Sequence, residues 1–247
     1  MPARCRAPAP LTLAPLTVYR RLLRAYGPQG WWPVTPTGGH LPRYRHGFLG
    51  RLTQRQRLEV CVGAILTQNT TWGNVEKAMS RLHAAGIRDL DGLLAVSQPR
   101  LERLIRSSGY FRQKAKKLKA FVRHLAGRGG KIADWLSGDL EALRVELLGL
   151  YGIGPETADS ILLYAAGRPS FVIDAYTLRI GKRLGWFRKP SYARAQSYLT
   201  RQIPKDARLY NEFHAVLVYF AKVCCRKTGP LCVECPLREV CRYGCDR

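Results

Sequence analysis

Four of the eight cysteines lie close together near the C-terminal end of the chain, in the pattern C-x6-C-x2-C-x5-C. Four thiolates in one short loop can surround one metal centre, and a [4Fe-4S] cluster requires four cysteine ligands. Zinc is the alternative, but four-cysteine zinc sites more often pair two CxxC motifs, and this group contains one. The N-terminal segment lacks the layout of an export signal, so the clustering indicates metal binding rather than disulfides. The predicted ligands are Cys225, Cys232, Cys235 and Cys241.

Asp174 lies in FVIDAYTLRIGKR, where a short apolar piece meets a helical pattern. An aspartate directly before a helix caps it, because the carboxylate accepts a hydrogen bond from a free amide of the first turn. Taken alone, the residue is best interpreted as a cap. A carboxylate can also stabilise the positive charge that develops on a sugar when a glycosidic bond breaks. The two roles are compatible, so Asp174 is a candidate catalytic residue.

The stretch LLGLYGIGPETADSILLYA, residues 147–165, joins two apolar helical patterns through Gly-Ile-Gly. Glycine permits the backbone conformations of a tight bend and lets a ligand approach the chain closely. Pro155 suits the first turn of the second helix, so the amides around Gly152, Gly154 and Glu156 would form an anion site at a helix N-terminus. We expect a DNA phosphate there, and an ordinary helix-helix turn without a ligand is the alternative.

The chain is strongly basic, with 41 Lys and Arg against 17 Asp and Glu and a formal net charge of +24. Such a charge favours a polyanion, because each cation laid against a phosphate releases a counterion. Ribosome association, membrane-surface binding and simple solubility are the alternatives. No apolar run approaches the length that spans a bilayer, so we expect no membrane partner and a cytoplasmic protein, nucleoid-associated if the source is prokaryotic.

The elements that must position these residues are helices. Apolar residues recur at helical spacing from residue 16 to 26. The same spacing continues through almost all of the chain after Thr53, an expected N-cap, and strand-type alternation is absent. The Pro- and Gly-rich stretch GPQGWWPVTPTGGHLPRYRHG predicts a long loop that carries two tryptophans. The fold class is therefore all-α.

Several motifs together resemble the endonuclease III superfamily of helix-hairpin-helix DNA glycosylases. They are the hairpin followed by FVIDAYTLRIGKRLG, the segments AILTQNT and SGYFRQKAKKL, and the cysteine loop, in order over about residues 52 to 241. The resemblance implies a two-lobed fold: a six-helix domain with the hairpin at 51–167 and a domain with the iron-sulfur loop at 16–50 and 168–247. The proline-rich opening without apolar periodicity separately predicts a flexible N-terminus at 1–15. The resemblance also implies a monomer that binds double-stranded DNA containing a damaged base, across a cleft between the lobes.

The resemblance assigns roles to individual residues. Asp174 matches the catalytic aspartate, and Gln68 matches the residue that fills the gap left by a flipped base. Tyr110 matches a second residue that is inserted into the DNA at that gap. Arg226 and Lys227 follow the first cysteine ligand and could contact a DNA phosphate. Lys182 or Lys189 could supply an attacking amine in place of the hairpin lysine that strand-cleaving members use. The family's strand-cleaving members carry a lysine where this chain has Glu156. A carboxylate cannot form an imine, so we expect a monofunctional glycosylase without strong lyase activity.

The segment Trp31, Trp32 and Pro33 resembles the base pocket of 3-methyladenine glycosylases of the endonuclease III type. A base alkylated at a ring nitrogen is cationic, so it stacks favourably on aromatic rings and leaves without prior protonation. Adjacent aromatics that merely anchor the loop are the alternative. The expected substrate is an alkylated purine, in particular 3-methyladenine. Two other functions stay open: an endonuclease III-like activity on oxidised pyrimidines or mismatched thymine or uracil, and a non-catalytic DNA-binding relative.

Overall fold

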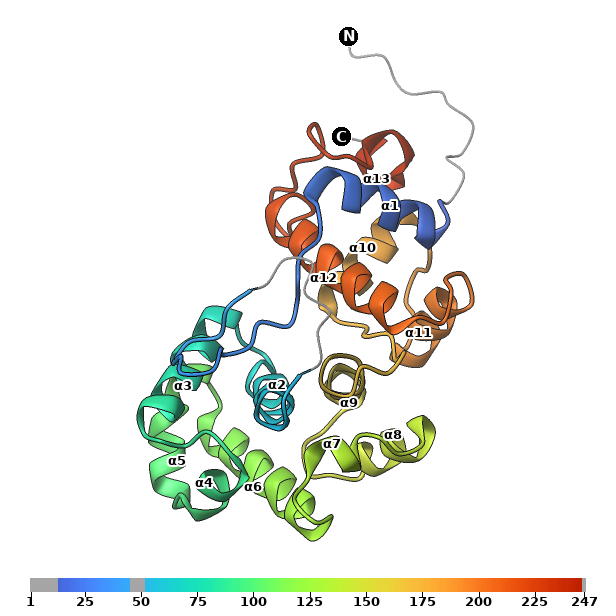
Figure 1. The fold of residues 1–247 in the computed structure, drawn as a ribbon. Helices are drawn as coiled ribbons and strands as arrows, with labels where there is room; N and C mark the ends of the chain where they lie inside the picture. Colours follow the sequence, from blue (N-terminus) through green and yellow to red (C-terminus); the bar gives the residue numbers. More distant parts are fainter. Residues whose placement is uncertain (1–12, 45–51, 246–247) are drawn as a thin grey trace. The chain divides into compact units, whose positions relative to one another are not determined.

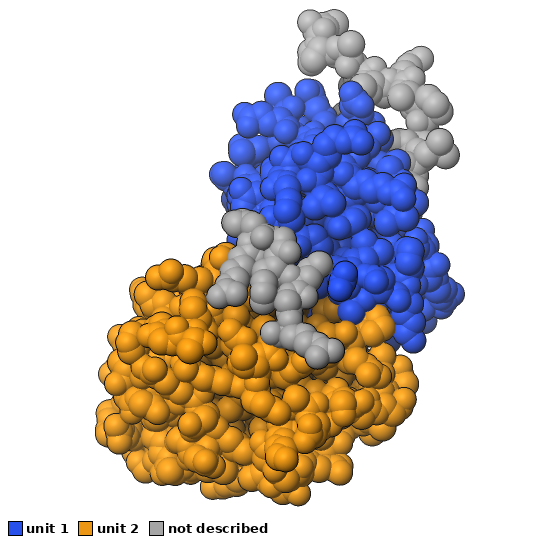
Figure 2. All heavy atoms as spheres, viewed as in Figure 1, with its two compact units in different colours: residues 1–31, 171–247 blue, residues 32–170 orange. Residues whose placement is uncertain are grey.

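The computed structural model describes residues 13–44 and 52–245, and these residues form two compact units (Figures 1 and 2). One unit contains the described residues up to Trp31 and from Phe171 onward, and the other spans Trp32–Ser170. Within the described part of the chain every regular element is helical, and β-type pairing is limited to one isolated bridge between Val34 and Arg43. The all-α prediction is confirmed for these residues.

The unit of residues 32–170 is built around α2 (Gln54–Leu66). Thr53 caps this helix as predicted, because its Oγ1 accepts from the Gln56 amide at 3.2 Å and the Gln56 side chain accepts from the Thr53 amide at 3.1 Å. From Leu58 to Leu66 every residue is buried, so this part of the helix forms the core of its unit, and Glu59 is its one charged residue. Around it lie α3 (Trp72–Ala84), α6 (Phe111–Gly127), α7 (Ile132–Trp135), α9 (Pro155–Ser160) and η2 (Ile161–Ala165).

The remaining helices of this unit cover the outside of that arrangement. They are α4 (Leu90–Ala95), α5 (Gln98–Leu104), η1 (Arg106–Ser108) and α8 (Leu140–Leu148). The hairpin runs from α8 through the glycines into α9, which continues directly into η2, a π-helical turn. The sequence predicted one continuous helix here; the wider turn is a local feature that apolar spacing does not reveal.

The unit of Phe171–Arg247 and the N-terminal segment is built on α12 (Ala207–Val223), against which α1 (Pro15–Tyr26) and α10 (Ala175–Leu184) pack. Then come α11 (Tyr192–Thr200) and the cysteine loop, with η3 (Arg238–Val240) and α13 (Arg242–Cys245). None of the described helices is long and apolar enough to cross a membrane.

The unit boundaries differ from the predicted domains in two places. Residues 168–170 lie in the unit of α2, although the prediction placed them with the C-terminal part. Residues 32–44 belong to the unit of α2, whereas the prediction grouped 16–50 with the C-terminal part. The physical reason is that the loop is anchored on α2, since Glu59 Oε1 accepts from both the amide and the hydroxyl of Thr35, at 2.9 and 2.6 Å. The predicted flexible segment 1–15 lies mostly outside the described residues, and Pro15 already begins α1.

Candidate functional site

Asp174 is the N-cap of α10 and is 8% exposed. Its Oδ1 accepts from the Thr177 amide at 2.7 Å, so the capping interpretation is correct. Its Oδ2 lies 3.6 Å from Nε2 of His214, a buried residue of α12. Burial alone would raise the pKa of Asp174, but His214 and the Thr177 amide together hold this pKa below its ordinary value. The carboxylate is therefore ionised at neutral pH.

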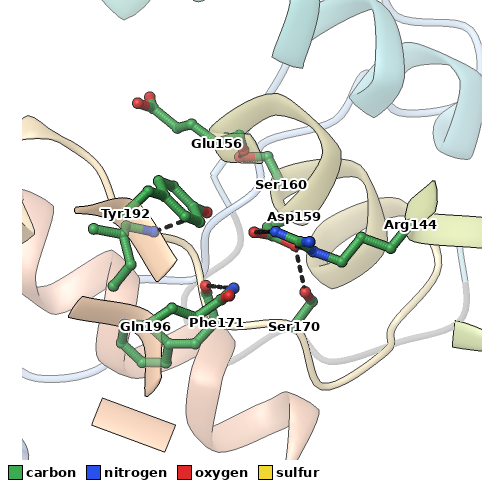
Figure 3. Close-up of polar contacts among 9 residues, drawn as sticks. Arg144, Glu156, Asp159, Ser160, Ser170, Phe171, Tyr192 and Gln196 are labelled. Atoms are coloured by element: carbon green, nitrogen blue, oxygen red, sulfur yellow. Dashed lines mark hydrogen bonds and ion pairs between the residues drawn. The ribbon is translucent and has the colours of Figure 1, made fainter. Parts of the chain in front are cut away.

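The extended segment before Asp174 is held by α11 (Figure 3). The Gln196 side chain donates to the Phe171 carbonyl at 2.7 Å, and the Ile173 amide donates to the Tyr192 hydroxyl at 3.3 Å. Phe171 and Ile173 are themselves almost fully buried. These contacts place the backbone on both sides of Val172 and so determine where Asp174 begins its helix.

The glycine turn of the hairpin has two different glycines. Gly152 has φ +76°, a left-handed conformation that favours glycine, and a Cβ built there would lie only 2.4 Å from Cε of Lys117. Gly154 is the extended N-cap of α9, and no heavy atom lies within 4 Å of a Cβ built there. Ile153 between them is buried and anchors the turn. The turn is thus shaped by Gly152, while Gly154 leaves an open surface.

Glu156 is exposed in the first turn of α9, and its carbonyl accepts from the Ser160 hydroxyl at 2.7 Å (Figure 3). Behind it, the fully buried Asp159 accepts from Arg144 Nε at 2.7 Å and Nη2 at 3.1 Å, and from the Ser170 hydroxyl at 2.6 Å. This bidentate pair fastens α9 to α8. The Glu156 side chain therefore projects from a rigid hairpin.

Gln68, the predicted gap-filling residue, follows α2 and touches the hairpin. Its Nε2 donates to the Gly152 carbonyl at 3.1 Å and to the Thr157 hydroxyl at 2.9 Å, while its Oε1 accepts from Lys117 Nζ at 2.6 Å. The adjacent Asn69 has φ +53°. The structure thus brings Gln68 together with Gly152.

Tyr110, the predicted second inserted residue, is 71% exposed. It precedes α6 with φ +44°, a conformation that costs free energy for a residue with a side chain. Strained exposed backbone of this kind clusters at functional sites. An exposed tyrosine in strained backbone has no packing role, which keeps Tyr110 as a candidate for contact with DNA.

The predicted base-pocket residues fall on either side of the unit boundary, which lies between Trp31 and Trp32. The Trp32 ring is half-buried and meets the rings of Trp72 and Tyr164, with centroid distances of 5.3 Å to each. Gly63 of α2 lies beneath it, since a Cβ there would be 3.0 Å from Cζ2 of Trp32. Pro33 is buried. Trp32 is therefore part of an aromatic cluster, and Tyr164 reaches it from the π-helical turn.

The four predicted cysteine ligands line a single pocket in the C-terminal loop. Apart from cysteines the lining is mainly apolar, with two arginines at its edge. All four are free thiols, and burial raises the pKa of Cys235 to about 12, so loading a metal centre must release protons. Within the described ranges no three Cys, His, Asp or Glu side chains are spaced for one metal ion. The four thiols line one mainly apolar pocket, and four thiols are the donor set that a [4Fe-4S] cluster requires.

Arg183 of α10 borders this pocket. Its Nη1 donates to the Cys225 sulfur at 3.1 Å and to the Arg226 carbonyl at 2.8 Å, and its guanidinium lies 4.4 Å from the centroid of the Tyr243 ring. Cys224 also lines the pocket but is outside the predicted spacing. The side chains of Arg226 and Lys227 are exposed, and their contact with phosphate stays a prediction. Arg183 supplies positive charge beside the Cys225 sulfur.

Comparison with known proteins now identifies the family. A model described as "HhH-GPD superfamily base excision DNA repair protein" matches residues 62–205. The chain belongs to this superfamily. It is 40% identical over 227 residues to "Putative DNA repair glycosylase MJ1434" of Methanocaldococcus jannaschii, covering 91% of this chain and 94% of that one. It is 31% identical over 185 residues to "Endonuclease III" of Thermotoga maritima, covering 74% and 82%.

A solved structure shows the same fold. It is the H. pylori 3-methyladenine DNA glycosylase bound to 1,N6-ethenoadenine, which matches with a TM-score of 0.68 and 25% identity over 85% of this chain and 98% of that one. The chain is thus a base excision repair DNA glycosylase of the endonuclease III type, with the endonuclease III-like helical fold that the motifs predicted.

Two contacting residues of this glycosylase were not predicted from the sequence. His214 beside Asp174 and Lys117 beside Gln68 are separated from their partners by 40 and 49 positions, so no local motif links them. The sequence offered one indication of His214, since its titratable side chain interrupts the mainly apolar run of LYNEFHAVLVYF. The glycosylase places Asp174 and the cysteines in one unit, and the hairpin, Gln68, Tyr110 and Trp32 in the other.

Proposed function

We propose that this glycosylase hydrolyses the N-glycosidic bond of a flipped alkylated purine, in particular 3-methyladenine, and leaves an abasic site. The observation that carries the proposal is the aromatic cluster of Trp32, Trp72 and Tyr164, in which Trp32 is partly exposed while Trp72 and Tyr164 are buried behind it. Aromatic faces attract cationic groups, and a ring-alkylated purine carries a positive charge. The likeness to a 3-methyladenine glycosylase over 98% of that chain supports the same substrate class.

The state of Asp174 suits this chemistry. A cationic base departs as a neutral leaving group and needs no general acid, so the main requirement is a negative charge near the sugar as oxocarbenium character develops. Asp174 is buried and ionised, and its lowered pKa keeps that charge available at neutral pH. We assign it the catalytic role and expect it to orient the attacking water as well.

The proposal includes a monofunctional mechanism. Glu156 stands where the strand-cleaving members carry a lysine, and its carboxylate cannot attack the sugar to form a Schiff base. Burial lowers the pKa of Lys114 to about 8, but this amine is held by the Leu66 and Ser108 carbonyls at 2.8 and 2.6 Å and is 1% exposed. It is therefore no substitute for the absent lysine.

We further propose that one monomer grips duplex DNA through the amides of the glycine turn and through Arg226 and Lys227, with Gln68 and Tyr110 entering the space of the flipped base. The net charge of +24 and the open surface at Gly154 support this role. We also propose that Cys225, Cys232, Cys235 and Cys241 hold a [4Fe-4S] cluster, which supplies four covalent anchors to a loop with little core of its own.

The second candidate is an endonuclease III-like activity on oxidised pyrimidines or mismatched thymine or uracil. The complete cysteine loop and the similarity to Endonuclease III of Thermotoga maritima favour it. The aromatic cluster and Glu156 argue for the alkylated purine instead.

The proposal is tested with the wild type and Asp174→Asn on a duplex containing one 3-methyladenine. The wild type should release the free base, and the variant should bind the duplex nearly as well but release none. Asn also caps helices, so the substitution leaves α10 intact while removing the charge. If the wild type binds tightly and releases no base from any lesion, the protein is a non-catalytic binder and the proposal fails.

A further inference from the structure

A buried histidine faces the carboxylate of Asp174 from a different helix. His214 lies on α12 and Asp174 caps α10, and the two are 6% and 8% exposed. Their facing atoms, Nε2 and Oδ2, lie 3.6 Å apart, which is ion-pair distance rather than a hydrogen bond. The other carboxylate oxygen, Oδ1, accepts from the Thr177 amide. Each oxygen of Asp174 therefore faces a separate nitrogen.

Such a partner matters because burial favours the protonated form of a carboxylic acid. A protonated Asp174 carries no charge and cannot stabilise positive charge on a sugar. The Thr177 amide donates to only one oxygen of Asp174, Oδ1, and this bond is the ordinary N-cap interaction of α10. His214 is the one titratable side chain, among the described residues, at ion-pair distance from the second oxygen.

We propose that His214 is a positioning residue for Asp174: it keeps the buried carboxylate ionised and holds its second oxygen in place for the reaction. The inference rests on the catalytic role proposed for Asp174, but not on which lesion is removed. His214 itself is not required to touch DNA.

Other groups around Asp174 do not supply this interaction. From the start of α11, the Tyr192 hydroxyl is taken by the Ile173 amide. α13 packs on α10, where Arg242 lies beside Gly185 at the C-terminal end of that helix. On α10 itself, Arg179 donates to the carbonyls of Ala221 and Cys225. Among the residues that the structure describes, His214 is the one cationic or titratable side chain recorded within ion-pair distance of Oδ2.

The first test measures thermal stability without DNA, in a cycle of His214→Ala, Asp174→Asn and the double variant. Because the pKa of Asp174 is lowered in the folded state, the pair stabilises the protein above the ordinary carboxyl range and loses this effect as pH falls through the folded-state pKa. At neutral pH, His214→Ala should lower Tm more in the wild-type background than in the Asp174→Asn background. Equal losses in both backgrounds at every pH would overturn the pairing.

The second test is the pH profile of single-turnover base release, on whichever lesion the wild type excises. The wild-type rate should persist into the acidic range, whereas His214→Ala should lose rate as pH falls, with its acidic limb displaced to higher pH. His214→Gln retains an N–H donor and should recover part of the rate. His83→Ala, which removes another buried histidine from the other unit, should leave the limb in place.

The two tests separate the possible failures. If the lesion assignment is wrong but His214 acts as proposed, the stability cycle still shows coupling and the displaced limb appears with the true substrate. If His214→Ala and His214→Gln lower both Tm and rate while the pH profile keeps its wild-type shape, the histidine is purely structural and the proposal is overturned.

Discussion

At the level of single residues, the chemistry of this glycosylase depends on the charged groups at positions 174 and 156. Asp174 is a capping residue and, by proposal, the catalytic carboxylate, and the structure shows that the cap leaves its second oxygen to His214. Glu156 is exposed at the start of α9. Both residues could be selected as candidates from the sequence alone, because each lies in a local motif. It could not reveal His214 or Lys117, since their contacts form only when distant helices pack.

The absence of an amine at position 156 has a direct chemical consequence. Borohydride reduces a Schiff base to a stable adduct, so an abasic-site duplex incubated with wild-type protein and borohydride should give no cross-linked species on a denaturing gel. The same duplex with a known strand-cleaving glycosylase is the positive control. A strong adduct would show that another amine of this chain attacks the sugar, and would remove the monofunctional assignment.

At the scale of elements, helix starts were predicted well and irregular turns were not. Thr53 caps α2 as expected, because a capping box involves residues within four consecutive positions and can be recognised from the sequence. The π-helical turn at Ile161–Ala165 and the anchoring of Thr35 on Glu59 depend on packing between separate segments, so periodicity could not reveal them. The unit begins at Trp32 rather than at the predicted residue 51, because the loop is held by this packing of Thr35 on Glu59.

The two hairpin glycines should respond differently to alanine. Gly152→Ala forces a side chain into left-handed backbone and displaces Lys117 from Gln68, so it should cost about 1–2 kcal/mol. We expect a Tm lower by about 2–8 °C. Gly154→Ala has normal backbone and open space, so its Tm should be unchanged.

DNA binding gives the complementary result for this pair. The Gly154→Ala methyl would stand where a phosphate approaches the turn, so its affinity for duplex should fall although its stability does not. Equal Tm losses for the two variants would contradict the hairpin geometry. Undiminished affinity of Gly154→Ala would contradict the phosphate site.

At the scale of the whole molecule, the sequence predicted the fold class and family, because the motifs are distributed in order along most of the chain. The cofactor is a proposal that iron analysis can test. Purified protein should be brown and contain about four irons per chain. Cys225→Ser should lose iron, whereas Cys224→Ser should keep it, although both cysteines line the same pocket. Stoichiometric zinc without visible absorption, or equal iron loss in both variants, would contradict the proposed ligand set.

The class of base that the enzyme removes can be determined by comparing single-turnover release rates from matched duplexes. Each duplex carries one lesion: 3-methyladenine, thymine glycol, or thymine or uracil mismatched with guanine. We expect release of 3-methyladenine about a hundredfold faster than any of the others, because only the cationic purine gains from the aromatic cluster around Trp32. Release of thymine glycol or mismatched thymine without release of 3-methyladenine would contradict the account and assign the glycosylase to the endonuclease III-like activity instead.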